Sequence, residues 1–256
     1  RNKSAMWFQD PLPGLNPVYT VGNQIEETLA LHQGLTGQAA TREAVDLLEA
    51  VGIPDARRRV DEYPHQLSGG MQQRAVIAMA LACDPDLLVC DEPTTALDVT
   101  IQAQILDLLA DLQREEDLAI LFITHDMGVI EDATDRVNVI YAGEIVERAP
   151  TGTLFSEPAH PYTEALLRSI PGRTNAAERL PTIEGEVPTP TGRAKDCRFA
   201  PRCPYAFAEC HEMPPEHVDV GAERYAACLL HEDGSEEAAE RTVFDGSEAV
   251  SGGDSA

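Results

Sequence analysis

Two acidic residues and a histidine stand where short apolar runs end, and their positions suggest phosphate chemistry. Asp91 and Glu92 follow the run 87–90, and His125 follows the run 119–123. Ligands of open α/β sheets gather at the carboxyl ends of strands. There, Asp91 suits a Mg²⁺ ion that bridges phosphate oxygens. Glu92 can orient or deprotonate an attacking water, and a neutral His125 imidazole can donate to a terminal phosphate.

Each of these residues also has an ordinary interpretation. An Asp-Glu pair is common on any protein surface. A lone histidine at such a position is more often a helix-start residue, with Asp126 as the alternative cap. The apolar run before Asp91 and the sequence Pro-Thr-Thr-Ala-Leu-Asp at 93–98 favour the functional interpretation of the acidic pair.

The segment 67–70, Leu-Ser-Gly-Gly, opens a predicted helix. Exposed backbone N–H groups and the helix dipole make such an end an anion site, and Gly69 and Gly70 permit close approach. The alternative is an ordinary helix start in which the Ser68 side chain caps the first turn. The Ser-Gly-Gly sequence by itself leaves both interpretations open.

The chain lacks the phosphate-binding loop that would complete such a site. Its two lysines are Lys3 and Lys195, and neither follows a glycine. The pattern G-x-x-x-x-G-K-[ST] therefore occurs nowhere in the 256 residues. Because the sequence runs at once into an apolar strand at 5–8, we expect that the natural beginning of the protein is missing.

Hydrophobic periodicity predicts an α/β fold with a parallel sheet. Four segments have helical spacing of apolar residues: 21–32, 41–51, 69–82 and 99–115. Three apolar runs have the length of strands: 87–90, 119–123 and 137–141. Strands that alternate with helices predict a parallel sheet on which the helices pack.

The second half of the chain predicts smaller elements and a change of character. A hairpin at 139–148 turns at Ala142-Gly143, and a helix begins at Pro161. We divide the chain into three parts: a sheet-containing domain at 1–156 with a helical subdomain at about 18–83, a loop-rich extension at 157–231, and a tail at 232–256. The tail is acidic, rich in Gly and Ser and poor in large apolar groups, which predicts disorder.

The charge of the chain excludes some partners. It carries 44 acidic and 19 basic side chains, for a formal charge of −25. Such a field repels nucleic acid and anionic lipid headgroups. A high net charge also keeps a protein soluble in a salt-rich cytoplasm. We favour this interpretation, in which the chain is a halophile's protein. No stretch approaches the ~20 apolar residues of a membrane span, and the first residues are not a signal peptide.

Four of the six cysteines lie close together in the loop-rich extension. They are Cys197, Cys203, Cys210 and Cys228, with five, six and seventeen residues between them. This spacing lacks the two-residue gaps of zinc ribbons, and a cytosolic setting argues against disulfides. An iron–sulfur cluster, a Cys₄ zinc site and unmetallated thiols remain as alternatives. Cys83 and Cys90 have the context of buried apolar residues.

Taken in order, the motifs resemble those of the ATP-binding subunits of ABC transporters. Nearly all of 1–150 is covered by this ordered set: Gln-Asp-Pro at 9–11, Leu-Ser-Gly-Gly-Met-Gln-Gln-Arg at 67–74, Leu-Val-Cys-Asp-Glu-Pro at 88–93, Ala-Leu-Asp at 96–98 and Thr-His-Asp at 124–126. Two details depart from the commonest pattern: Met-Gln-Gln at 71–73 and Cys90 before the aspartate. Neither removes a group that the mechanism needs.

The resemblance implies roles for individual residues. Nucleotide binding is implied for Gln9, Ser68, Gly69, Gly70, Gln72, Asp91 and Asp98. Gln9 would sense Mg²⁺ and the γ-phosphate, and 68–70 would touch the γ-phosphate of ATP held on a partner subunit. Asp91 would position Mg²⁺, and Asp98 would cross the dimer interface. Glu92 would be the catalytic base and His125 the switch histidine. ATP and Mg²⁺ are the implied cofactors.

The extension narrows the resemblance to the oligopeptide/dipeptide importer subfamily. The segments 158–163, Pro-Ala-His-Pro-Tyr-Thr, and 197–205, Cys-Arg-Phe-Ala-Pro-Arg-Cys-Pro-Tyr, carry it. It implies a four-iron four-sulfur centre on the four clustered cysteines. The implied partners are a second ATPase subunit, identical or different, two transmembrane permease subunits and, indirectly, an extracytoplasmic binding protein. The implied place is the cytoplasmic face of the membrane.

Three functions follow as alternatives. The first is an ATPase subunit that energises peptide import, inactive in this chain alone because the fold, a P-loop NTPase-like sheet with an inserted helical subdomain, lacks its N-terminal end. The second is a non-hydrolysing assembly or regulatory subunit. The third, an ABC ATPase of DNA repair or translation, is disfavoured by the acidic charge and the importer-like extension. Nickel or another small solute stays open as cargo.

Overall fold

The computed structural model describes residues 4–7, 14–93, 99–116, 118–170, 182–190 and 192–232. The chain divides into two compact units, Arg1–His125 and Asp126–Ala256. This division lies earlier than the boundary at 156 that the sequence suggested for the first domain. The strand at 144–150 pairs with the strand at 225–227 of the extension, so the hairpin belongs to the second unit.

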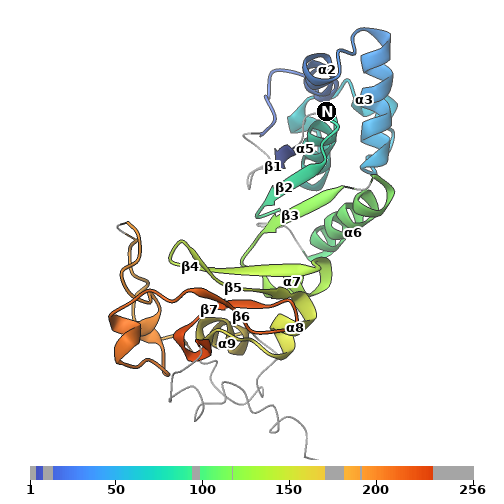
Figure 1. The fold of residues 1–256 in the computed structure, drawn as a ribbon. Helices are drawn as coiled ribbons and strands as arrows, with labels where there is room; N and C mark the ends of the chain where they lie inside the picture. Colours follow the sequence, from blue (N-terminus) through green and yellow to red (C-terminus); the bar gives the residue numbers. More distant parts are fainter. Residues whose placement is uncertain are drawn as a thin grey trace, which may run out of the picture. The chain divides into compact units, whose positions relative to one another are not determined.

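The first unit contains most of the helices (Figure 1). They are α2 (Val21–His32), α3 (Gln38–Ala50), α4 (Ala56–Arg59), the 3₁₀ turn η1 (Pro64–Gln66), α5 (Gly69–Leu81) and α6 (Val99–Glu116). Thr20 caps α2 by accepting from the Asn23 N–H at 3.2 Å. The inner faces of α2, α3 and α5 bury Ile25, Leu48 and Ile77 completely. The predicted helices at 21–32, 41–51, 69–82 and 99–115 are therefore present.

The sheet of the first unit is parallel, as predicted. Its strands are β1 (Ser4–Trp7), β2 (Leu87–Asp91) and β3 (Ala119–Ile123), in the order β1-β2-β3. Trp7, Cys90 and Phe122 occupy one row across the three strands. Helix α6 connects β2 to β3, which is the crossover that parallel neighbours require.

The two faces of this sheet have different surroundings. Trp7, Leu88 and Cys90 face the core and are at most 1% exposed. The alternate residues Met6, Leu121 and Ile123 are 44, 45 and 46% exposed. The sequence predicted a parallel sheet on which helices pack. Among the described residues, one face of the sheet stays open to solvent, although its large side chains are mainly apolar.

The second unit has an antiparallel sheet. Its strands are β4 (Arg136–Tyr141), β5 (Glu144–Pro150), β6 (His217–Asp219) and β7 (Tyr225–Ala227), in the order β4-β5-β7-β6. The remaining elements are α7 (Met127–Ala133), α8 (Thr151–Ser156), α9 (Pro161–Arg168) and the 3₁₀ turns η2 (Ala200–Arg202), η3 (Ala208–His211) and η4 (Leu229–His231). The strand predicted at 137–141 is thus present but does not belong to the parallel sheet, because its hairpin partner directs it into the antiparallel one.

The β4–β5 hairpin has a two-residue turn and a bulge. Ala142 and Gly143 both have positive φ, 47° and 83°, which is the conformation of a type I′ turn. Between the pairs Val139↔Glu147 and Ile140↔Ile145 the register shifts by one residue. A bulge re-aims side chains, and here both Val146 and Glu147 are buried.

The buried Glu147 fixes the start of α9. Its two carboxylate oxygens accept from the Ala159 N–H and the His160 N–H, each at 2.8 Å. The His160 Nδ1 then accepts from the Tyr162 N–H at 3.0 Å, and Pro161 occupies the first helical position. The segment Pro-Ala-His-Pro-Tyr-Thr at 158–163 therefore forms the start of α9 and its contacts with Glu147.

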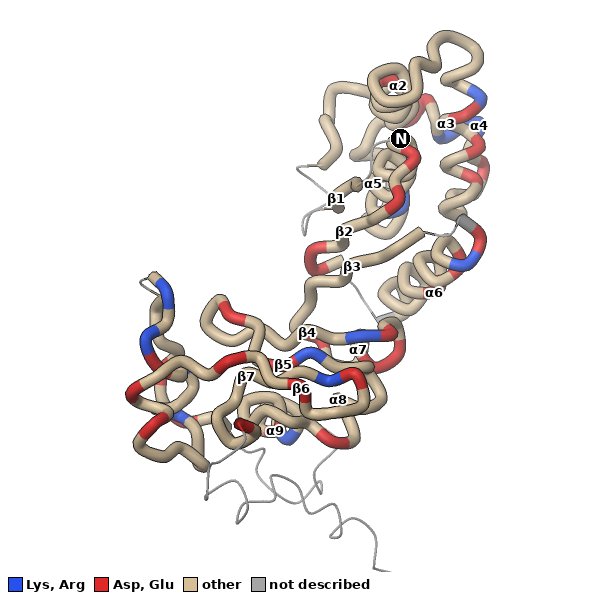
Figure 2. The backbone as a smooth tube through the Cα atoms, viewed as in Figure 1, with Lys and Arg blue, Asp and Glu red and all other residues tan. Residues whose placement is uncertain are grey.

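Acidic side chains are spread along the elements of both units (Figure 2). The run of three arginines at 57–59 lies in α4. Arg58 and Arg59 both pair with Glu62, at 3.6 and 3.0 Å. In the part of the chain that the structure describes, no helix has the length and apolar character of a membrane span.

Candidate functional site

Glu92 and His125 meet at the carboxyl edge of the parallel sheet. His125 Nδ1 lies 2.7 Å from Glu92 Oε1. The pairing has a local cause, since β2 and β3 are adjacent parallel strands and both residues follow strand ends. The Glu92 N–H donates to the Ile123 carbonyl at 2.8 Å, and Glu92 has a left-handed φ of 52°. This conformation is unusual for a residue with a side chain and directs Glu92 away from the strand.

The two side chains of this pair differ in exposure. The Glu92 side chain is 19% exposed and the His125 side chain is 80% exposed. Asp126 begins α7, where its carboxylate accepts from the Gly128 N–H at 2.9 Å. Asp126 rather than His125 is therefore the helix cap, which leaves the histidine ring to contact Glu92 and solvent.

Asp91 is the last residue of β2 and is half-buried. Mg²⁺ at phosphate sites takes one or two carboxylates and completes its shell with water and phosphate oxygens. Asp91 together with Glu92 matches that need at the correct edge of the sheet. No group of three or more His, Cys, Asp or Glu side chains in the described ranges forms a metal site, so the protein alone does not build a cage there.

Ser68 precedes α5 in an extended conformation, with φ −68° and ψ 160°. Its side chain makes no capping hydrogen bond, so the expected serine cap is absent. The Ser68 carbonyl accepts from the Gln72 N–H at 2.9 Å. The first N–H groups of α5 are thus not satisfied by this hydroxyl, and the anion-site interpretation of the helix start stays a prediction.

The two glycines of this segment have different surroundings. A Cβ added to Gly69 would meet no atom within 4 Å, whereas one added to Gly70 would lie 3.1 Å from Ile101 Cγ2. Gly69 is thus open to an approaching ligand, and Gly70 permits close packing of α5 against α6. This packing role was not predicted.

The Gln72 side chain is turned toward its own chain. Its Nε2 donates to the Pro64 carbonyl at 2.8 Å and to the Leu67 carbonyl at 3.2 Å. It therefore holds the segment that leads into α5, and its implied contact with nucleotide stays a prediction. Gln9 and Asp98, the other two implied nucleotide contacts, lie outside the described residues.

The four cysteines of the extension lie near one another in the second unit. The Cys197 N–H donates to the Cys210 carbonyl at 3.0 Å. Burial, with smaller contributions from the nearby Cys197, Cys203 and Cys210, raises the pKa of Cys228 to about 12. None of the four forms a disulfide, and Cys210 and Cys228 are buried.

These cysteines have suitable chemistry for a metal but not the positions. Thiolates bind iron and zinc, and a metal would have to displace the protons that burial holds on Cys197 and Cys228. However, none of the described His, Cys, Asp and Glu side chains form a group with metal-site geometry. The sequence-based expectation of an iron–sulfur centre is therefore not supported by this arrangement. Cys90 is fully buried, as predicted, and burial raises its pKa to about 12.

Comparison with protein families gives two matches. The profile of the ABC transporter family matches residues 1–95. The profile described as oligopeptide/dipeptide transporter, C-terminal region, matches residues 146–210. The two matches lie in the segments that carry the nucleotide motifs and the importer-like extension, respectively.

Two relatives of high sequence identity are named as peptide import ATP-binding proteins. A protein of Brucella abortus (strain 2308) named as a peptide import ATP-binding protein is 54% identical over 211 residues, 82% of this chain and 64% of the relative. A protein of the same description from Brucella melitensis biotype 1 is 51% identical over 234 residues, 89% of this chain and 69% of the relative. The chain thus spans about two thirds of the length of these relatives.

Solved structures share the fold. A dimeric ATP-binding cassette in a post-hydrolysis state, bound to ADP and Pi, is 30% identical, with a TM-score of 0.51 over 59% of this chain and 63% of that one. The protein cbiO1 of Clostridium perfringens, part of the ABC transporter complex cbiONQ, is 28% identical, with a TM-score of 0.54 over 60% of each chain.

Proposed function

We propose, from the premise that this chain belongs to the family of peptide import ATP-binding proteins of ABC transporters, that it energises the import of peptides by ATP hydrolysis. The fold is that of an ABC ATPase. The observation that carries the proposal is the contact of 2.7 Å between Glu92 and His125 beside Asp91. It supports the proposal because two carboxylates and an imidazole lie at one edge of the sheet, where we propose that they act as Mg²⁺ ligand, base and hydrogen-bonding partner.

Each residue of this edge has a chemical role in the proposal. Glu92 accepts the proton of the water that attacks the γ-phosphorus. His125 orients the Glu92 carboxylate through Nδ1, and an Nε2–H donor to the γ-phosphate requires the imidazolium form, in which both ring nitrogens donate. Asp91 would hold Mg²⁺, which would supply charge neutralisation for the transferred phosphoryl group.

The start of α5 serves a different pocket. Ser68 and the open Gly69 present backbone N–H groups, which bind the γ-phosphate of ATP on a partner ATPase subunit. Since the 256 residues contain no phosphate-binding loop, we expect very weak ATP affinity for this chain alone. Calorimetric titration with Mg·ATP measures it, and micromolar binding would overturn this part of the proposal.

The catalytic test supplies the loop. The N-terminal segment of the Brucella melitensis relative is fused ahead of Arg1 if it contains G-x-x-x-x-G-K-[ST], and ATP hydrolysis is measured. Glu92→Gln should lower the rate at least ~100-fold while Mg·ATP still binds. The matched control is Glu115→Gln, on an exposed position of α6, which should leave the rate unchanged. A rate that persists in Glu92→Gln would contradict the role of this carboxylate.

A second candidate function rests on the start of α5, where the Ser68 side chain makes no capping hydrogen bond. A subunit that completes a partner's site through 68–70 without hydrolysing ATP itself would act in assembly or regulation. In that case Gly69→Val in this chain should reduce the partner's ATP hydrolysis, and Glu92→Gln should not. Gly69→Val lowers hydrolysis under both candidates, so Glu92→Gln is the substitution that distinguishes them.

The family is the basis for what we propose about the cargo, the partners and the location of the protein. Two permease subunits, a second ATPase subunit and an extracytoplasmic binding protein are the proposed partners, with the chain on the cytoplasmic face of the membrane. Peptides are the proposed cargo because the extension matches the oligopeptide/dipeptide profile. Uptake of a labelled dipeptide and of Ni²⁺ by cells with and without the gene tests this. If only nickel uptake is lost without the gene, the chain would instead be a subunit of a metal importer.

We also propose a four-iron four-sulfur cluster on the clustered cysteines. Four soft donors in one region support it, although a rearrangement of the thiols is required. Iron and acid-labile sulfide in anaerobically purified protein, lost on Cys228→Ser, would agree. Zinc without iron would contradict it.

Finally, we propose that the acidic surface is an adaptation to salt. A charge of −25 destabilises the compact state by self-repulsion, and salt screens it. Raising KCl from ~0.1 M to ~1 M shortens the Debye length from about 10 Å to about 3 Å and should raise the melting temperature. A melting temperature that does not change with KCl would exclude the adaptation.

A further inference from the structure

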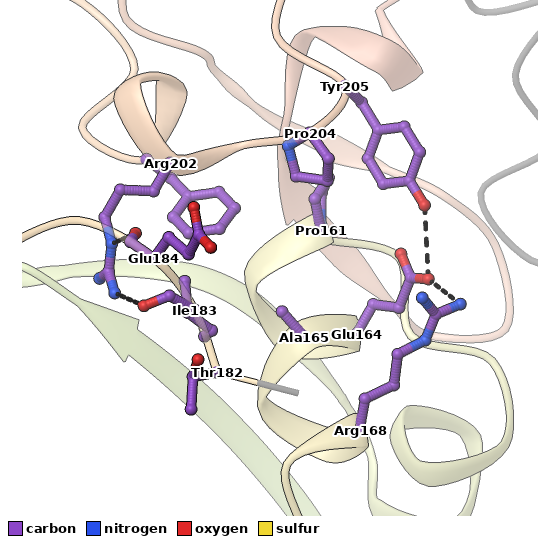
Figure 3. A pocket seen from close by; sticks show the side chains of 11 residues that line it. Pro161, Glu164, Ala165, Arg168, Thr182, Ile183, Glu184, Arg202, Pro204 and Tyr205 are labelled. Carbon is purple, nitrogen blue, oxygen red and sulfur yellow. Dashed lines mark hydrogen bonds and ion pairs between the residues drawn. The ribbon is translucent and has the colours of Figure 1, made fainter. Parts of the chain in front are cut away.

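A pocket of about 270 Å³ lies in the second unit, beside helix α9 (Figure 3). Helix α9 forms one wall, and the segments 182–184 and 202–205 form the others. The walls are mainly apolar, and include Pro161, Ala165, Ile183, Phe199 and Pro204. The volume is close to the lower limit for pockets that bind small molecules, and it suits a ligand of a few to about ten heavy atoms.

One acidic side chain of the pocket is buried with half of its hydrogen-bonding capacity unused. Glu164, in the first turn of α9, is 3% exposed. Its Oε1 accepts from the Tyr205 hydroxyl at 3.4 Å and pairs with Arg168 at 2.6 Å. Figure 3 shows both partners converging on this carboxylate. Its Oε2 is buried and accepts no hydrogen bond from the described residues.

This arrangement is energetically incomplete. A buried carboxylate oxygen without a donor loses the hydrogen bonds that water would give it. Burial accordingly raises the pKa of Glu164, against the opposing effects of Arg168 and Tyr205. A positively charged N–H donor at Oε2 would supply the missing hydrogen bond, and such charge-assisted bonds are the stronger kind.

The opposite wall does not favour an anion. The Arg202 guanidinium donates to the carbonyls of Ile183 and Glu184, each at 2.8 Å, and to the Tyr141 hydroxyl at 3.2 Å. Three of its five N–H groups are thus directed into the protein. Arg168 is paired with Glu164, and the exposed Glu184 adds a second negative charge to the lining.

We propose that this pocket is a binding site for a small molecule that carries a primary ammonium group. The Glu164 carboxylate turns so that Oε2 faces the pocket and accepts from the ammonium, and the apolar part of the ligand packs on Pro161, Ile183 and Phe199. Amino acids or short peptides and aliphatic diamines share this chemistry. A quaternary ammonium, which has no N–H, lacks the hydrogen bond and binds more weakly.

Calorimetric titration of the whole chain tests the proposal with three probes. They are alanyl-alanine, its N-acetylated form and putrescine. Alanyl-alanine or putrescine should bind, and acetylation should weaken the dipeptide about 10-fold or more, because it removes the charged donor. Binding of the dipeptide alone identifies amino acids or peptides as the source, and binding of putrescine alone identifies diamines. No binding of either amine, or equal binding after acetylation, would overturn the proposal.

Two variants locate the binding. Glu164→Gln should weaken the bound amine about 10-fold, and Ala165→Phe should abolish binding by filling the pocket from the adjacent helical position. The matched control is Glu157→Gln, an exposed carboxylate outside the pocket, which should bind as the unchanged chain does. Full affinity in a folded Ala165→Phe protein would place the ligand elsewhere. The acetylation result does not depend on the folding of any variant.

Discussion

The two sheets of the molecule follow the same alternation but present different outer faces. In β4, the buried residues Val137, Val139 and Tyr141 alternate with exposed ones, and the exposed set includes Arg136 and Asn138. In the parallel sheet, the exposed residues are Ser4, Met6, Ala119, Leu121 and Ile123. One outer face is thus largely polar, and the other is mainly apolar.

This difference shows which surface is adapted to water. Scattered exposed apolar residues are ordinary, but a contiguous row of them on a sheet marks a surface that another segment or molecule covers. The antiparallel sheet also has exposed Ile140 and Ile145, although these are confined to one cross-strand pair near the turn. The parallel sheet should therefore behave as a two-faced layer, with a face that stabilises the fold and a face that contributes little.

Truncating one side chain on each face tests whether only the closed face stabilises the fold. Of the predictions made here, it has the largest expected effect on the unfolding free energy. Leu88→Ala removes a fully buried side chain and should cost about 2–5 kcal/mol of unfolding free energy. Leu121→Ala, on the open face, should cost less than about 1 kcal/mol. Trp7, the single tryptophan, is buried on the closed face, so its fluorescence in urea reports the unfolding of the first unit.

The relative size of the two losses is what decides the outcome. Equal losses for Leu88→Ala and Leu121→Ala would mean that the open face is covered in solution. In that case a second copy of the chain should be detectable by sedimentation, and the Leu121→Ala protein should dissociate.

Much of this fold could be predicted from the sequence, and for identifiable reasons. Helical periodicity located α2 and α6, and Ala142-Gly143 located the hairpin turn, because these signals are local. The contact between Glu92 and His125 follows from two adjacent parallel strands that end at the same edge.

Other features depend on contacts that a pattern does not contain. The apolar residues of β3 gave no indication that only Ile120 and Phe122 are partly buried while the others are exposed. The burial of Glu147 depends on a bulge opposite Val139, and the carboxylate is satisfied by N–H groups twelve and thirteen residues away. The absence of a capping bond at Ser68 depends on a hydroxyl orientation that the residue type does not determine.

A substitution at the bulge tests the second unit and should have an intermediate effect. Glu147→Gln retains one carbonyl acceptor but sets an amide N–H₂ group against the second backbone N–H. We expect a loss of about 1–3 kcal/mol, visible by near-ultraviolet circular dichroism of the tyrosines and without effect on the Trp7 transition. Glu186→Gln, at an exposed position, is the control. A shift of the Trp7 transition as well would show that the two units unfold together.

The smallest effect, and the most specific to the second unit, is a dependence of its stability on pH through His160. Burial, with a contribution from His231, lowers the pKa of His160 to about 3, whereas the unfolded chain has a histidine pKa near ~6.5. The unfolded state therefore binds the proton more tightly, so the stability is complete above pH ~6.5 and falls by up to about 1.4 kcal/mol per pH unit below it.

His160→Asn preserves a side-chain acceptor for the Tyr162 N–H but does not titrate. Urea unfolding between pH ~6.5 and ~5 should thus show a steeper loss in the unchanged protein than in His160→Asn, while the Trp7 transition of the first unit shows the same slope in both. Equal slopes in the unchanged protein and in His160→Asn would mean that His160 is protonated in the folded chain. The segment that the Glu147 carboxylate binds through the His160 N–H would then have to hold an imidazolium instead of a neutral ring.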